Sequence, residues 1–332
     1  MYNQSDSVPR ADISTVLMEA VGQEKQFIAQ QVFPVFPSAT EIGRYPKFKI
    51  ASGELLKAQG ATKRSVTGSY VEVDRKFTWD SYQTEEYGAE ERIDDAVARR
   101  MQNFFDAEMV TAKLLMNELM LDYEIQAAAA LYNTNATTAA YNPGFVQNNA
   151  STAWLTANLP TMDVPADVNT VIQNMTLAGE EPEVMVISLQ LWNLIRRSTK
   201  LQTWVYGFLN VSQGGSQITP QMFAQCFGLR DIIIAKKSVD VSPKGTPDGS
   251  ASLQPVWSNA YCAFAKLGAG DFLNGGVGRT IIWDADAPGG LFTSESYRDE
   301  PRRSNKVRVR SNRVIKAINP LSCQLIVTGF TS

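Results

Sequence analysis

Residues 94–133 read DDAVARRMQNFFDAEMVTAKLLMNELMLDYEIQAAAALYN, a stretch with neither proline nor glycine. Because those two residue types interrupt helices, their absence predicts one continuous helix of about 40 residues, a rod of roughly 60 Å. Asp94 and Asp95 suit its N-terminal end, where the helix dipole favours negative charge. A helix in a globular domain averages only about 11–12 residues. We therefore interpret this one as a spine shared by two lobes.

The apolar residues of this spine form a face that drifts around the helix axis. They are Val97, Met101, Phe104, Phe105, Ala112, Leu115, Leu119 and Leu131. No heptad repeat is sustained, so a coiled coil is the weaker interpretation.

Upstream of the spine, residues 45–82 have the composition of a long, polar β-hairpin. Strand-forming residues such as Val71, Val73 and Trp79 alternate in part with charged ones, and three glycines interrupt the run. A hairpin standing alone in water is only marginally stable, so it needs a partner surface. Packing inside the chain and packing on a neighbouring subunit remain equally open.

Residues 1–50 are predicted to be an arm. Asp12 can cap a helix that begins near Ile13, because apolar residues then recur at helical spacing. Pro34 and Pro37 end that helix and leave an extended apolar segment. This segment is either a core strand of the chain itself, which the sequence slightly favours, or a strap across a neighbour.

Downstream of the spine, residues 160–300 are predicted to be a mixed α/β lobe. Its expected helices are 167–177, 189–198 and 220–227, and its expected strands are 183–188, 232–235, 280–283 and 291–295. Two further strands, 306–310 and 323–327, close the chain. In the first of them, Lys306, Arg308 and Arg310 would share one face, and Val307 and Val309 the other.

The composition makes catalysis improbable. The chain of 332 residues contains no histidine, which removes Ser–His and Cys–His nucleophile pairs and imidazole metal ligands. The three cysteines lack metal-ligand spacing, and no glycine-rich phosphate-binding motif opens a helix. We expect no enzyme activity, no cofactor and no metal. We also expect no membrane association, because no apolar run approaches 18–20 residues and the N-terminus lacks the features of a secretory signal.

The order of arm, hairpin, long helix, α/β lobe and terminal strands resembles the major capsid proteins of tailed double-stranded-DNA bacteriophages. The motifs that carry the resemblance are FIAQQVFPV at 27–35, GRY at 43–45, Tyr82, YG at 87–88, Glu91, IDD at 93–95 and LDYE at 121–124. The resemblance implies an α+β fold with four parts. These are an N-terminal arm (1–50), an extended β-hairpin loop (51–84), a peripheral domain with the spine helix (85–160 and 300–332) and an α/β axial domain (161–299).

The same resemblance implies a function. The chain would self-assemble as pentamers and hexamers into an icosahedral shell around the phage genome, and would be located in the virion after synthesis in the host bacterial cytoplasm. Portal, scaffolding or decoration proteins would be further partners. Packaged DNA would be held only by weak, non-specific contact, in keeping with a net charge of −3. An encapsulin-like nanocompartment shell, another phage structural component and a histidine-independent hydrolase are the alternatives.

Charge is segregated along the chain, which suggests how subunits meet. Residues 85–95 are mostly acidic and residues 298–313 mostly basic. Bases of one subunit would pair with acids of the next, or else pair within the chain, face solvent, or line the inner surface beside DNA. Reversing the charges of Arg308 and Arg310 would then abolish assembly and leave the monomer folded. The candidate inter-subunit contacts are Phe33, Phe36, Arg44, Lys57, Lys63, Arg64, Glu85, Glu86, Glu90, Arg302, Arg303, Arg308 and Arg310. We predict no covalent Lys–Asn cross-link, since no motif surrounds Lys57, Lys63, Asn312 or Asn319.

Overall fold

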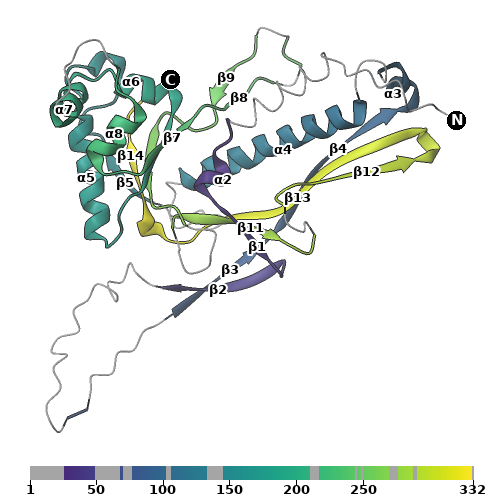
Figure 1. Ribbon diagram of the computed structural model, residues 1–332, viewed down its shortest axis with the longest axis horizontal. Coiled ribbons are helices and arrows are strands. Elements are labelled where there is room, and N and C mark those ends of the chain that lie inside the picture. Colours follow the sequence, from purple (N-terminus) through teal and green to yellow (C-terminus); the bar gives the residue numbers. More distant parts are fainter. Residues whose placement is uncertain are drawn as a thin grey trace.

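The computed structural model describes residues 26–48, 68–69, 77–101, 106–132, 145–209, 217–243, 245–247, 250–268, 276–286 and 290–330. A helical lobe lies at one end and a long, narrow sheet at the other, with helix α4 (Ala107–Leu131) running along that sheet (Figure 1). A two-stranded hairpin projects from the body between them (Figure 1).

The narrow sheet is organised by its longest strand, β13 (Ser304–Ala317). Strand β4 (Glu85–Asp94) pairs antiparallel with one edge of β13. On the other edge, β12 (Thr293–Asp299) pairs with its first half and β11 (Gly278–Trp283) with its second. Strand β1 (Val35–Ser38) then adds in parallel to β11.

The predicted alternation in this strand is confirmed. Val307 and Val309 are buried in one cluster with Leu115 and Leu119 of α4, and the charged residues between them are only half-buried. The period of two residues thus places one face of β13 under the spine helix and leaves the other polar.

The prediction of one continuous 40-residue helix is wrong. Helix α3 covers Asp95–Met101, and α4 begins only at Ala107. Asp106 between them has an extended backbone, with φ −77° and ψ 105°, and its carboxylate accepts hydrogen bonds from the amides of Glu108 and Met109. Asp is among the best N-cap residues, so it starts a new helix here without any proline or glycine. The spine is thus 25 residues long, about 37 Å.

The helical lobe contains a second sheet, in the order β5-β14-β10-β6-β7. Its strands are β5 (Val146–Asn149), β14 (Cys323–Val327), β10 (Tyr261–Ala265), β6 (Val184–Ser188) and β7 (Asp231–Ala235). Its helices are α5 (Val164–Leu177), α6 (Leu189–Ile195), α7 (Thr199–Leu209) and α8 (Pro220–Phe227). Trp154 and Trp257 are fully buried in this part of the molecule.

The two sheets divide the chain differently from the predicted domain boundaries. We call the narrow sheet around β13 the peripheral sheet and the sheet of the helical lobe the axial sheet. Strands β11 and β12 lie within the range expected for the axial domain, yet they belong to the peripheral sheet. Conversely, β14 lies in the range expected for the peripheral domain but sits inside the axial sheet. The chain therefore passes between the two lobes more often than the predicted domain boundaries require.

The base of the predicted hairpin is present. Strands β2 (Ile42–Phe48) and β3 (Phe77–Gln83) pair antiparallel over seven positions. A smaller pair, β8 (Ser238–Asp240) and β9 (Leu253–Pro255), lies beyond β7. Short 3-10 turns at Thr156–Asn158, Glu300–Arg302 and Pro320–Ser322 complete the described elements.

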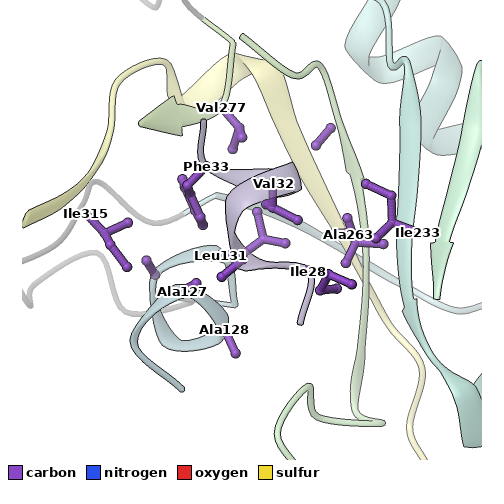
Figure 2. Close-up of a cluster of buried hydrophobic side chains, with 14 of the residues drawn as sticks. Ile28, Val32, Phe33, Ala127, Ala128, Leu131, Ile233, Ala263, Val277 and Ile315 are labelled. Atoms are coloured by element: carbon purple, nitrogen blue, oxygen red, sulfur yellow. The ribbon is translucent and has the colours of Figure 1, made fainter. Parts of the chain in front are cut away.

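The described part of the arm packs on its own chain. Helix α2 (Ala29–Val32) and Phe33 lie against the C-terminal turns of α4, where Ile28, Val32 and Phe33 meet side chains of both lobes (Figure 2). Of the two interpretations left open for the extended segment, the structure shows a strand of this chain's own sheet. The helix predicted from Ile13 lies outside the described residues.

Candidate assembly surfaces

The arm is fixed to the spine by Glu124, a completely buried carboxylate on α4. It accepts hydrogen bonds from the backbone amides of Ile28 (3.1 Å to each oxygen) and Ala29 (2.9 Å), and from Trp257 Nε1 (2.6 Å). Helix α2 has no cap from its own N-cap residue, Ile28, so the spine supplies one. Burial raises the pKa of Glu124, while the bonds from Trp257 and the two amides oppose that rise.

Tyr123 and Asp122, the two residues before Glu124, attach further segments of the chain to α4. The Tyr123 hydroxyl bonds Thr280 Oγ1 at 2.5 Å and donates to the Phe33 carbonyl at 3.3 Å, which ties the arm to β11. Asp122 accepts a 3.0 Å hydrogen bond from the buried guanidinium of Arg313. That guanidinium also lies 4.6 Å from the centre of the Tyr87 ring and 5.2 Å from that of Tyr123, so a charge pair and aromatic faces together accommodate it.

The basic residues on the open face of the peripheral sheet meet acids of the same chain. Arg308 donates to Glu90 at 2.9 Å, and Lys306 lies 3.5 Å from the same carboxylate. Arg310 contacts Asp286 and, at 2.9 Å, Glu295. Arg308 and Tyr297 hold the pKa of Glu90 below its usual range. Pairing within the chain, which the sequence had left open, is what the structure shows for these bases.

Arg298 makes the same kind of contact from the opposite face of the sheet, because it pairs with Asn305 and not with Lys306. Its guanidinium donates to both oxygens of Asp95, at 2.5 and 2.8 Å, and lowers the pKa of that carboxyl. Arg298, Arg308 and Arg310 are thus each paired with acids of the same chain. Reversing the charges of Arg308 and Arg310 would also break these ion pairs within the chain, and the expectation that the monomer stays folded while assembly is lost stays a prediction.

The remaining candidate contacts fall into three groups. Phe33 is fully buried in the chain's own core, so it is not available to a neighbour. Phe36 is half-buried, with Arg279 5.5 Å from its ring centre. The exposed candidates are Arg44, Glu85, Glu86, Arg302 and Arg303. Lys57, Lys63 and Arg64 lie outside the described residues.

One face of the β2–β3 hairpin exposes two large apolar side chains, with Arg44 and Ser81 between them. Ile42 on β2 and Trp79 on β3 are 62% and 66% exposed, and Arg44 lies on the same face because it alternates with Gly43 and Tyr45. The alternation of side chains along β2 is the sequence pattern that could have indicated this face. Isolated apolar residues are common on surfaces, whereas a tryptophan this exposed on a projecting element indicates a contact surface.

A second exposed apolar surface lies between α5 and α7. A groove of about 800 Å³ is lined by Pro165, Ala166, Trp204 and Phe208, with the Lys200–Asp163 ion pair (2.8 Å) at its rim. Trp204 and Phe208 are 45% and 62% exposed at this groove. Helix α7 itself was not predicted.

The described residues offer little reactive chemistry. They contain no group of three or more Cys, Asp or Glu side chains placed to hold a metal ion. Burial raises the pKa of the Cys262 and Cys323 thiols. None of the described helices is long and apolar enough to cross a membrane.

The sequence matches no family model and no curated protein, but solved structures match along nearly its whole length. A phage-related protein from Bordetella bronchiseptica has a TM-score of 0.62 at 18% identity, over 95% of this chain and 96% of that one. The capsid protein of cyanophage P-SCSP1u gives 0.55 at 11% identity, over 91% and 88%. An encapsulin of Synechococcus elongatus gives 0.51 at 11% identity, over 98% and 92%.

These likenesses establish the fold of the chain. The chain has the α+β major-capsid fold that phage capsid proteins and encapsulins share, and the fold expected from the sequence is confirmed.

Proposed function

We propose that this chain is the major capsid protein of a tailed double-stranded-DNA bacteriophage, a structural subunit that self-assembles into an icosahedral shell. The observation that carries the proposal is the projecting β2–β3 hairpin, whose exposed face presents Ile42, Arg44 and Trp79. Burying Trp79 and Ile42 against a neighbour would recover roughly 25 cal/mol for each Å² of apolar surface. A shell gives every copy of the chain such a neighbour.

The shell would be built from pentamers and hexamers of the chain. The α5–α7 groove is a further apolar surface for contacts between copies, and Phe36, Arg44, Glu85, Glu86, Arg302 and Arg303 are positioned to take part from the surface. We propose the same role for Lys57, Lys63 and Arg64. Glu90, Arg308 and Arg310 would contact a neighbour in addition to the ion pairs that they make within the chain.

Further partners follow from the same proposal. A portal, and scaffolding or decoration proteins, would join the shell, which would be made in the host cytoplasm and found in the virion. Contact with packaged DNA would be weak, because the net charge is −3 and the bases of β13 are paired with acids.

An encapsulin-like nanocompartment shell is the second candidate, favoured by the likeness to the Synechococcus encapsulin. Both candidates predict closed shells, so only the contents distinguish them. DNA inside shells from infected or induced cells indicates a virus, whereas an enzyme cargo indicates a nanocompartment.

Electron microscopy of the purified chain, together with its mass from light scattering, tests the proposal. We expect closed shells, or rings of five and six. Trp79→Ser should remain folded and monomeric, while Leu253→Ser, which alters an equally exposed leucine on β9, should assemble normally. A monodisperse monomer or dimer of the unaltered chain at every salt concentration would contradict the proposal.

A further inference from the structure

Helix α4 is apolar on two sides, and the described chain covers only one of them. Leu115 and Leu119 pack against β13. On the opposite side, Leu114 is 60% exposed and Ile125 41% exposed, with the half-buried Leu121 between them. Spacings of seven and four residues place these three side chains in one row along the helix, in which the exposed Glu118 stands between Leu114 and Leu121. We call this row the outer stripe.

The arm reaches α4 beside one end of this stripe. The amides of Ile28 and Ala29 bond Glu124, the residue next to Ile125. Phe27 lies under Lys237, whose Nζ is 4.6 Å from the ring centre. Residues 1–25 therefore join the described chain near the C-terminal half of α4, where Ile28 and Ala29 are bonded to Glu124.

The sequence of that connecting segment suits the stripe. Ile13, Val16, Leu17, Ala20 and Val21 recur at the spacing of one helix face. A helix over residues 13–21 would be about 14 Å long, and the stripe from Leu114 to Ile125 is about 16 Å long. Residues 22–26 can span up to roughly 16 Å, which is enough to bring the two rows together.

We propose that residues 13–21 dock as an amphipathic helix on the outer stripe of α4 in the same chain. This contact does not depend on shell assembly. It extends the attachment that Glu124 begins at residues 28 and 29, so that the arm follows the spine over much of its length.

Hydrogen exchange of the full-length chain, kept unassembled at low concentration, tests this contact. We expect amides of residues 13–21 to exchange at least tenfold more slowly than an unstructured peptide does. Leu114→Asp should restore the fast rate, because it places a charge in the stripe. Leu177→Asp should not, because it alters an exposed leucine on α5. Both positions are on the surface, so both variants should fold, which the melting temperature checks.

A disulfide identifies which chain supplies the segment. In a Cys226→Ser background, Leu17→Cys combined with Leu114→Cys should oxidise to a cross-link within one chain at any protein concentration. A cross-link found only between two chains would overturn the proposal and assign the stripe to a second copy. Fast exchange of residues 13–21 in the unaltered, unassembled chain would overturn it as well.

Discussion

At the scale of single residues, Glu124 has the most consequential role that the structure reveals. It lies 96 positions from Ile28 in sequence, yet it caps the helix that starts there and accepts the indole N–H of Trp257. One buried carboxylate thus connects the arm, the spine helix α4 and the segment that precedes β10. The sequence motifs around Ile28 and Glu124 supported the resemblance to capsid proteins, and the structure brings them into direct contact.

Removing this carboxylate should destabilise the subunit. Glu124→Ala leaves the Trp257 indole and two amides buried without an acceptor, and each such group costs about 1–3 kcal/mol. With three such groups, we expect a total loss of at least about 3 kcal/mol in the free energy of unfolding, measured by urea denaturation of the unassembled chain. Glu124→Gln keeps one carbonyl oxygen and should lose less. Equal stability of the alanine variant and the unaltered chain would show that the clamp has no energetic role.

The Glu90–Arg308 pair gives the peripheral sheet an acid-sensitive contribution. Arg308 and Tyr297 hold the pKa of Glu90 below its ordinary value of 4.5. The folded state therefore binds this proton less readily than the unfolded state. The contribution is present above pH 4.5 and is lost as the pH falls through the lowered pKa. We expect a shallower loss of melting temperature in acid for Arg308→Ala than for the unaltered chain. An identical pH profile would contradict this assignment.

At the scale of elements, the break in the spine shows how one side chain sets the length of a helix. The absence of proline and glycine permits a helix through residue 106 but does not require one. The Asp106 carboxylate competes by bonding the amides of Glu108 and Met109, which a continuous helix would not leave free. The result is a short α3 followed by a 25-residue α4.

Replacing this cap should weaken α4 at its first turn. Asp106→Ala is expected to lose about 1 kcal/mol, the usual cost of removing an N-cap side chain. Asp106→Ser is the matched control, since serine also caps and should retain most of the stability. Faster hydrogen exchange at residues 108–110 in the alanine variant alone would locate the effect. Unchanged exchange there would mean that packing on β13, and not the cap, holds the turn.

At the scale of the whole molecule, the two lobes share a core. The cluster in Figure 2 contains Phe33 and Leu131 together with Ala263 of the axial sheet and Ile315 of the peripheral sheet. Because side chains from both sheets pack on the same arm residues, neither lobe can lose its structure without exposing the other. The described subunit is therefore expected to unfold as one cooperative unit.

Truncating Phe33 tests this coupling. Phe33→Ala should cost about 3–5 kcal/mol, the usual range for a buried phenylalanine. Tryptophan fluorescence reports mainly on the axial lobe, and exchange of the β4 amides reports on the peripheral sheet. Both should shift to the same lower denaturant midpoint. Separate midpoints would show that the lobes unfold independently.

The sequence by itself determined the features that depend on neighbouring residues. The alternation in β13, helix α8 at Pro220–Phe227 and strand β14 at Cys323–Val327 follow from local periodicity and from caps, so they could be predicted closely. Only the tertiary structure decided which segments meet. Strand β4 pairs with a strand more than 200 residues away, and its Glu90 binds Arg308 of that strand. Phe33 enters a core built from both sheets. Those outcomes depend on which distant surfaces bury together, and local sequence patterns carry no record of that choice.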